Sequence, residues 1–401
     1  MRVVFVNRYY HPDISATSQI LTDLAVHLAP RCDVQVVTSR QRIDDPAAAL
    51  PAEERVQGVT IHRVWTSRFG RERLAGRAFD YATFQALAAW RILRLARRGD
   101  LVVAMTDPPL MSVPARWAAH AKGARLVNWV QDLFPEIAEA LGVRLASGMP
   151  GRILAGLRNA SLRHAEANVA LCDLMAGRLA ALGVAPAKLR AIHNWSDGTA
   201  IRPLAPEANP LRAEWGLQGR YVVGYSGNMG RAHDLAPLLE AARRLTGRDD
   251  IAFLFIGTGP QRAALEAAAR GLPNVAFRPY QPRERLGESL AVPDCHVVSL
   301  KPALEGLVMP SKLYGSLAAG RPVLFIGARD GEIGTLMARH DIGRRVAPDD
   351  TEALVQAIRG LADHPAESRR MGANGRALFE GRYERAMAFA AWDALIESFR
   401  G

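Results

Sequence analysis

The most informative segment for chemistry runs from Glu305 to Gly315, with the sequence EGLVMPSKLYG. Pro310, Ser311 and Lys312 fall where a helix is expected to begin, so the lysine and the free amides of the first turn could bind a pyrophosphate. Glu305 precedes them in a loop, where its carboxylate could accept hydrogen bonds from sugar hydroxyls. The alternative is a solvated helix lysine together with a solvent-facing loop carboxylate.

A glycine-rich turn follows the strand expected at Tyr221–Tyr225. Gly227, Asn228 and Gly230 stand before a predicted helix, where small residues allow backbone N–H groups to approach a phosphate. Arg231 could add a bidentate clamp on the same anion. The alternative is an ordinary glycine-rich surface turn.

A similar arrangement follows the next strand, expected at Ile251–Ile256. Gly257 and Gly259 begin a GxGxxG pattern, but Arg262 occupies its third glycine position. The segment is therefore a poor nicotinamide signature, and we interpret it as a second phosphate-approaching turn.

Nothing in the sequence indicates a metal centre or a disulfide framework. Asp349 and Asp350 precede a predicted helix and are typical of an N-cap, and no Asp-x-Asp pair stands in a cleft-forming position. We therefore expect no metal and no cofactor. Isolated histidines and cysteines are interpreted as ordinary residues; they are His62, His120, His164, His340, Cys32, Cys172 and Cys295.

Strands and helices alternate along the whole chain, which predicts βα units and mostly parallel sheets. Buried strands are expected at 2–7, 33–38, 59–65, 101–105, 125–130, 168–171, 221–225, 251–256, 274–277, 294–300, 322–325 and 342–346. Prolines 203, 206 and 210 mark a linker. We therefore predict an α/β fold with domains at 1–200 and 201–382, and a helix at 383–401 that packs on either domain.

Composition limits the class of protein. With 401 residues, 49% hydrophobic and 23% charged, the chain is of ordinary globular type. We find no transmembrane run or signal peptide and expect a cytoplasmic protein. The net charge of +11 comes from an arginine-rich chain and is weak support for a nucleic-acid partner, so none is expected.

The charge excess is concentrated between Arg68 and Arg98, which carries a net +6. Within a helix expected at 80–98, an arginine cluster shares its arc with Leu87 and Trp90, and Phe69 lies among further arginines. The basic residues of this stretch are Arg68, Arg71, Arg73, Arg77, Arg91, Arg94, Arg97 and Arg98. Such a surface suits peripheral docking on an anionic membrane; the alternative is a solvated face with Trp90 covered by a loop.

The segments at 224–231, 256–260 and 304–322, in this order and spacing, resemble the donor half of the family 4 glycosyltransferases. The resemblance implies the GT-B fold, in which two Rossmann-like domains face each other across a cleft. In the family, a Glu–x7–Glu element binds the donor, and Glu305 matches its first glutamate; Gly315 stands where the second, ribose-binding glutamate belongs. Ser311 and Leu313 would be donor-binding residues of the variant PSKLYG, which resembles a subgroup of bacterial surface-polysaccharide transferases of the colanic-acid and O-antigen type, including proteins assigned as N-acetylfucosaminyl transferases.

The resemblance extends to the first half of the chain. The loop HPDISATS after the first strand replaces a frequent Gly-Gly pair of the family, and Thr17 and Ser18 could donate there to the donor diphosphate or the acceptor. Asp132 and Glu136, in NWVQDLFPE, would face the acceptor. Asp132 is equally well placed to cap the next helix.

The resemblance implies a retaining glycosyltransferase that moves a sugar from a nucleotide diphosphate donor, UDP-linked by expectation, to a polysaccharide or polyprenyl-diphosphate-linked precursor. Arg231 and Lys312 would hold the departing diphosphate. Two alternatives are a non-transferring GT-B relative, such as a nucleotide-sugar epimerase, and a basic nucleic-acid-binding protein, which only the isoelectric point favours.

Overall fold

The structure is a computed structural model that describes residues 1–42, 45, 50–70, 74–143 and 146–400. The chain forms two compact units. The first consists of Met1–His193, Leu307–Met309 and Phe389–Gly401, and the second of Asn194–Gly306 and Pro310–Ala388.

An eight-stranded sheet of order β3-β4-β2-β1-β5-β6-β7-β8 forms the centre of the first unit. The strands are β1 (Arg2–Val6), β2 (Asp33–Ser39), β3 (Glu53–Val56), β4 (Val59–Val64), β5 (Leu101–Met105), β6 (Arg125–Val130), β7 (Ala167–Ala170) and β8 (Leu189–Ala191). Neighbouring strands are parallel, except that β3 pairs antiparallel with β4. Long apolar runs such as Val3–Val6 suit this sheet, because parallel strands are covered on both faces.

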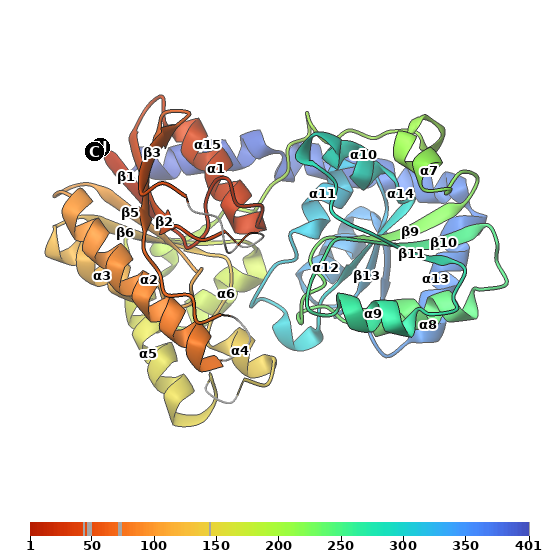
Figure 1. Cartoon of the computed structure of the whole chain (residues 1–401), viewed down its shortest axis with the longest axis horizontal. Helices are drawn as coiled ribbons and strands as arrows, with labels where there is room; N and C mark the ends of the chain where they lie inside the picture. The colour runs from red at the N-terminus through yellow and green to blue at the C-terminus, as the bar shows by residue number, and fades with distance from the viewer. Residues whose placement is uncertain (43–44, 46–49, 71–73, 144–145, 401) are drawn as a thin grey trace. The chain divides into compact units, whose positions relative to one another are not determined.

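Helices cover both faces of this sheet (Figure 1). They are α1 (Ala16–Leu28), α2 (Leu74–Leu95), α3 (Ser112–Ala121), α4 (Glu136–Ala140), α5 (Gly148–His164), α6 (Asp173–Ala181) and most of α15 (Arg385–Glu397). One core joins α2 and α3 to the sheet side that includes Leu126. Trp129 points to the opposite side, because strand side chains alternate, and its ring meets Trp392 of α15 at 4.7 Å.

The second unit is built on a fully parallel six-stranded sheet of order β11-β10-β9-β12-β13-β14. Its strands are β9 (Tyr221–Ser226), β10 (Ile251–Ile256), β11 (Val275–Arg278), β12 (Cys295–Ser299), β13 (Val323–Ile326) and β14 (Gly343–Val346). Its helices are α7 (Pro210–Glu214), α8 (Ala236–Arg244), α9 (Arg262–Ala268), α10 (Leu286–Ala291), α11 (Lys312–Ala318), α12 (Glu332–His340), α13 (Thr351–Asp363) and α14 (Pro365–Leu378). One sheet face packs under α8, α9 and α13, and the other under α7.

The strand order confirms the α/β prediction. All twelve expected strands are present, each with ends within one residue of the expected ones, while β3 and β8 were not predicted. The edge strands β11 and β14 were expected to be buried but are mainly half-buried. Asp350 caps α13 as expected, because its carboxylate accepts a hydrogen bond from the Ala353 N–H at 2.9 Å.

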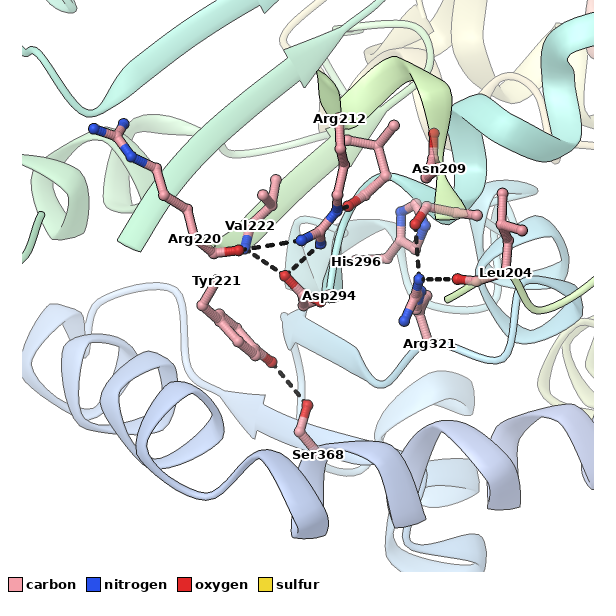
Figure 2. Close-up of polar contacts among 12 residues, drawn as sticks. Leu204, Asn209, Arg212, Arg220, Tyr221, Val222, Asp294, His296, Arg321 and Ser368 are labelled. Atoms are coloured by element: carbon pink, nitrogen blue, oxygen red, sulfur yellow. Dashed lines mark hydrogen bonds and ion pairs between the residues drawn. The ribbon is translucent and has the colours of Figure 1, made fainter. Parts of the chain in front are cut away.

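A buried polar network fastens the segment that opens the second unit to the amino-terminal ends of its strands (Figure 2). Arg212 of α7 pairs with Asp294 at 2.5 Å, and Asp294 also accepts the Val222 N–H at 2.7 Å. Arg321 donates to the carbonyls of Leu204 and Ala291, at 2.7 and 2.8 Å. These contacts lie at the amino-terminal end of the sheet, opposite to the loops that follow the carboxyl ends of the strands.

Candidate functional site

The order of the second sheet reverses between β9 and β12, which lie side by side. From β9 the chain continues outward to β10 and β11, and from β12 it continues the other way to β13 and β14. In open parallel sheets such a switch point leaves a crevice at the carboxyl ends of the strands, where ligands bind. The loops after β9, β10 and β12, together with the first turn of α11, contain all the donor-side residues singled out from the sequence.

The two glycine-rich loops are joined to each other by backbone hydrogen bonds. The Gly227 N–H donates to Ile256 O at 2.9 Å, and the Met229 N–H donates to Thr258 O at 2.7 Å. A Cβ at Gly257 would stand 2.3 Å from Gly227 O, and Gly227, Gly257 and Gly259 all have positive φ. Glycine is required here because two backbones meet, and these two amides already have protein partners.

Lys312, the first residue of α11, reaches under the first glycine loop. Its Nζ lies 3.1 Å from His233 Nε2 and 4.9 Å from the centre of the Tyr225 ring, and a Cβ at Gly227 would fall 2.8 Å from its Cε. Burial lowers the pKa of Lys312 to about 8. Lys312 is therefore an enclosed cation at the switch point rather than a solvated helix residue.

Glu305 is also buried, with 7% of its surface exposed, so the alternative of a solvent-facing carboxylate is wrong. Its carboxylate accepts the Glu332 N–H at 3.3 Å, at the first turn of α12. A Cβ at Gly331 would stand 2.2 Å from the carboxyl carbon, so a larger residue there would displace this carboxylate. The positive end of a helix stabilises such a negative charge.

The other donor-side residues lie around this pair in different environments. Arg231, Asn228 and Ser311 are exposed, Gly230 is half-buried, and Pro310 and Leu313 are buried. Ser311 does not cap α11 through its side chain. Gly315 is buried, and a Cβ there would lie 3.2 Å from the Leu290 side chain. This position therefore packs against α10.

In the first unit, Asp132 lines a cavity of about 30 Å³ below the ends of β5 and β6. Asp132 Oδ1 and Asn128 Oδ1 are both buried there, and neither accepts a hydrogen bond from the part of the chain that the structure describes. Burial, with a smaller contribution from Asp107, raises the pKa of Asp132 to about 6, although a hydrogen bond from Thr106 opposes the rise. A cavity of this size can hold a water molecule or a ligand hydroxyl that donates to both oxygens.

The capping alternative for Asp132 is wrong, because α4 has Pro135 at its N-cap and no side-chain cap bond. Asp132 instead pairs with Val308 in an isolated antiparallel bridge, and the Leu133 N–H donates to Leu307 O at 2.9 Å. Residues 307–309, which follow the Glu305 loop, are in this way part of the first unit.

The three remaining acceptor-side residues differ in their availability. Glu136 forms a two-point ion pair with Arg158, at 2.5 and 3.0 Å. Ser18 is buried and donates to Asp13 O at 3.0 Å, whereas Thr17 is half-buried in the first turn of α1.

The outer face of α2 carries an exposed tryptophan beside its arginines. Trp90 is 49% exposed, so a covering loop is excluded, and the Arg94 guanidinium lies 4.9 Å from its ring centre. Arg97 and Arg98 are exposed, but Arg91 donates to Glu53 at 3.2 Å and to His62 at 2.6 Å. Arg71 and Arg73 lie outside the described residues.

Two residues near the switch point of the second sheet were missed by the sequence analysis. His233 contacts Lys312, and Tyr280, which is 40% exposed, approaches Gly257. Tyr280 could have been predicted from the sequence, because it stands two residues after β11 and therefore at the carboxyl end of a parallel strand, where ligands bind. His233 lies in the loop after β9, beside Arg231. No group of three metal-ligating side chains occurs among the described residues.

Family models match both units. The description "Glycosyl transferase 4-like domain" matches residues 16–195, and "Glycosyl transferases group 1" matches residues 220–364. The chain is 27% identical over 334 residues to a protein described as glycosyltransferase WbjE of Pseudomonas aeruginosa, covering 82% of each. It is 34% identical over 263 residues to a protein described as the colanic acid biosynthesis glycosyl transferase WcaI of Escherichia coli, covering 63% of this chain and 64% of that one.

The structure resembles that of HepE from Anabaena in complex with UDP and glucose, with a TM-score of 0.73 and 15% identity over 99% of this chain and 100% of that one. Fold and matches together define a glycosyltransferase of GT-B type. The chain belongs to the family 4 glycosyltransferases of the bacterial surface-polysaccharide kind, which confirms the resemblance. No helix among the described residues is long and apolar enough to span a membrane.

Proposed function

We propose that this enzyme transfers a sugar, with retention of configuration, from a UDP-linked donor to a polysaccharide or polyprenyl-diphosphate-linked precursor. The observation that carries the proposal is the enclosed Lys312 ammonium beside two interlocked glycine loops at the switch point of the second sheet. An ammonium in such a site favours a ligand with concentrated negative charge, such as a diphosphate. HepE, which shares the fold, binds UDP and glucose.

In this proposal Lys312 and Arg231 neutralise charge on the departing diphosphate, and no metal is required. The C1–O bond to the diphosphate breaks as the acceptor oxygen forms a bond to C1 on the same face of the sugar. The acceptor proton moves to the departing diphosphate oxygen, so no protein base is needed. Glu305 accepts hydrogen bonds from donor sugar hydroxyls, and Asp132 accepts one from the acceptor.

Binding calorimetry with UDP, GDP and ADP, in EDTA, tests the donor assignment. We expect UDP to bind most tightly and binding to persist without metal. Preference for GDP or ADP would contradict the UDP-linked donor, and a metal requirement would contradict metal-independent binding. The anomeric configuration of the product, read by NMR, tests retention. Interconversion of nucleotide-linked sugars without an acceptor would instead indicate an epimerase.

The exposed faces of α2, α3 and α5 support a peripheral position on an anionic membrane. Trp90 on α2, Trp117 on α3 and Ile153 on α5 are all about half exposed or more, and these helices pack in sequence, α2 on α3 and α3 on α5. Arg94 lies in the last turn of α2, and Arg97 and Arg98 follow directly after the helix ends; all three are exposed. Aromatic side chains with flanking arginines suit the interface of an anionic leaflet, where each basic residue contributes about 1 kcal/mol.

Vesicle co-sedimentation with and without anionic lipid tests this position. We expect binding that is lost at high salt and in a variant with Arg94, Arg97 and Arg98 changed to serine. Arg244, Arg248 and Arg270 of the second unit, changed together, serve as the charge-matched control. Equal binding by the two triple variants, or none by the wild type, would contradict membrane docking.

A further inference from the structure

His233 stands between a backbone carbonyl and the ammonium of Lys312. Its Nδ1 lies 2.5 Å from Ser299 O at the end of β12, and its Nε2 lies 3.1 Å from Lys312 Nζ. Because a carbonyl can only accept, Nδ1 must carry the proton in this contact. In a neutral imidazole Nε2 then has a free lone pair, which accepts from the ammonium.

The surroundings keep this imidazole neutral. Burial, followed by the neighbouring Lys312, lowers the pKa of His233 to about 4. The backbone around His233 is fixed as well, since the Gln261 side chain donates to His233 O at 3.1 Å and to Gly230 O at 2.5 Å. The ring therefore holds one tautomer in one orientation.

We propose that His233 is the positioning residue for Lys312: it fixes the ammonium between the Tyr225 ring and the Gly227 turn, ready for the donor diphosphate. The inference rests on the proposed function, because it takes the diphosphate to be the ligand of Lys312. The imidazole acts in the same way as an outer-shell partner of a metal ligand, which orients the group that touches the ligand.

No carboxylate among the described residues pairs with Lys312. From β9 it faces Tyr225, whose hydroxyl donates to Asn228 O at 2.7 Å. In the loop before α8, the Asp234 carboxylate accepts the Ala236 N–H at 3.3 Å, while Arg231 is exposed. Lys312 is thus held by a neutral acceptor and an aromatic ring, with no carboxylate partner in the described part of the chain.

Donor binding supplies a counter-charge and therefore favours the protonated amine. With a pKa near 8, about half of the free protein carries a neutral Lys312 at pH 8, so the Lys312 amine takes up about 0.5 proton on UDP binding at pH 8 and about 0.1 at pH 7. Removing the Nε2 acceptor destabilises the ammonium, which shifts this uptake to lower pH.

Calorimetry of UDP binding in buffers of different ionisation enthalpy measures the affinity and the proton uptake together. We expect His233→Leu to weaken UDP binding about 10-fold, in the range of outer-shell partners, and to increase uptake at pH 7. His233→Gln keeps an acceptor and a donor and should bind UDP within about 3-fold of the wild type. His340→Leu, on an exposed histidine at the end of α12, is the matched control.

Each outcome has one meaning. If the wild type binds none of UDP, GDP and ADP, the proposed function fails and the inference falls with it. If UDP binds and His233→Leu leaves affinity or uptake unchanged, only the inference is overturned, since a purely structural histidine would not move the proton count. Lys312→Met must abolish the uptake; uptake that persists in this variant would assign the proton to another group and overturn the inference, even if His233→Leu does not fold.

Discussion

Replacing Asp132 with asparagine should make the protein more stable and less active. The enclosed carboxylate has its pKa raised from 3.8 to about 6, chiefly by burial. A group whose folded pKa lies above its unfolded value contributes stability below the unfolded pKa and loses that contribution as the pH rises through the folded one. Above pH 6 the native state therefore holds a carboxylate that would be better solvated in the unfolded chain.

The difference between the two pKa values sets an upper limit of about 3 kcal/mol for this cost at pH 7.5. The same linkage gives about 1.6 kcal/mol at pH 5, where the folded carboxyl is mostly protonated and the unfolded one is not. Asn128 Oδ1, which lines the same cavity without a partner among the described residues, offers an acceptor for the new amide. Asp132→Asn should thus gain up to these amounts.

Urea unfolding of the wild type and Asp132→Asn at pH 5 and pH 7.5 measures the gain, with Asp249→Asn on an exposed aspartate as the control. Transfer activity should fall in the same variant, because an amide presents a weaker acceptor to a sugar hydroxyl. A variant no more stable at pH 7.5, or a gain that does not shrink at pH 5, would refute the charge-burial argument. A more stable variant with full activity would refute only the acceptor role.

Three further predictions concern the second unit. Glu305→Gln should lower the transfer rate by about 10²-fold in a steady-state assay while the melting temperature stays within a few degrees, because a positioned charged contact is lost; full turnover would remove the sugar role. Lys312→Met and Arg231→Ala should each weaken UDP binding by about 1.5–3 kcal/mol in calorimetry, the range for charge-assisted hydrogen bonds, and unchanged affinity in both would contradict the diphosphate assignment. Asp294→Asn should cost about 3–5 kcal/mol in urea unfolding, because it leaves Arg212 buried without its counter-charge; a loss below 1 kcal/mol would show that the pair is dispensable.

Most of the strands were predictable because they are short apolar runs, although the edge strand β14, with the sequence GRRV, is not one. The two missed strands lack that signal. β3 has the sequence EERV, with a charged, partly exposed pattern that suits an antiparallel edge, and β8 is only three residues long with two of them exposed. Edge strands need little hydrophobicity, so local pattern cannot separate them from loops.

The candidate site was predictable as a set of loops, but not in its contacts. Lys312 and His233 are 79 residues apart, and the carboxylate of Glu305 accepts a hydrogen bond from a helix that begins 27 residues later. Local composition predicts which segments end a strand and could approach a phosphate, whereas the strand order decides which loop ends meet. For Asp132, the sequence allowed a cap or an acceptor contact. The structure decides against the cap, because Pro135 occupies the N-cap position of α4 with no side-chain cap bond, and the Asp132 carboxylate lines the cavity instead.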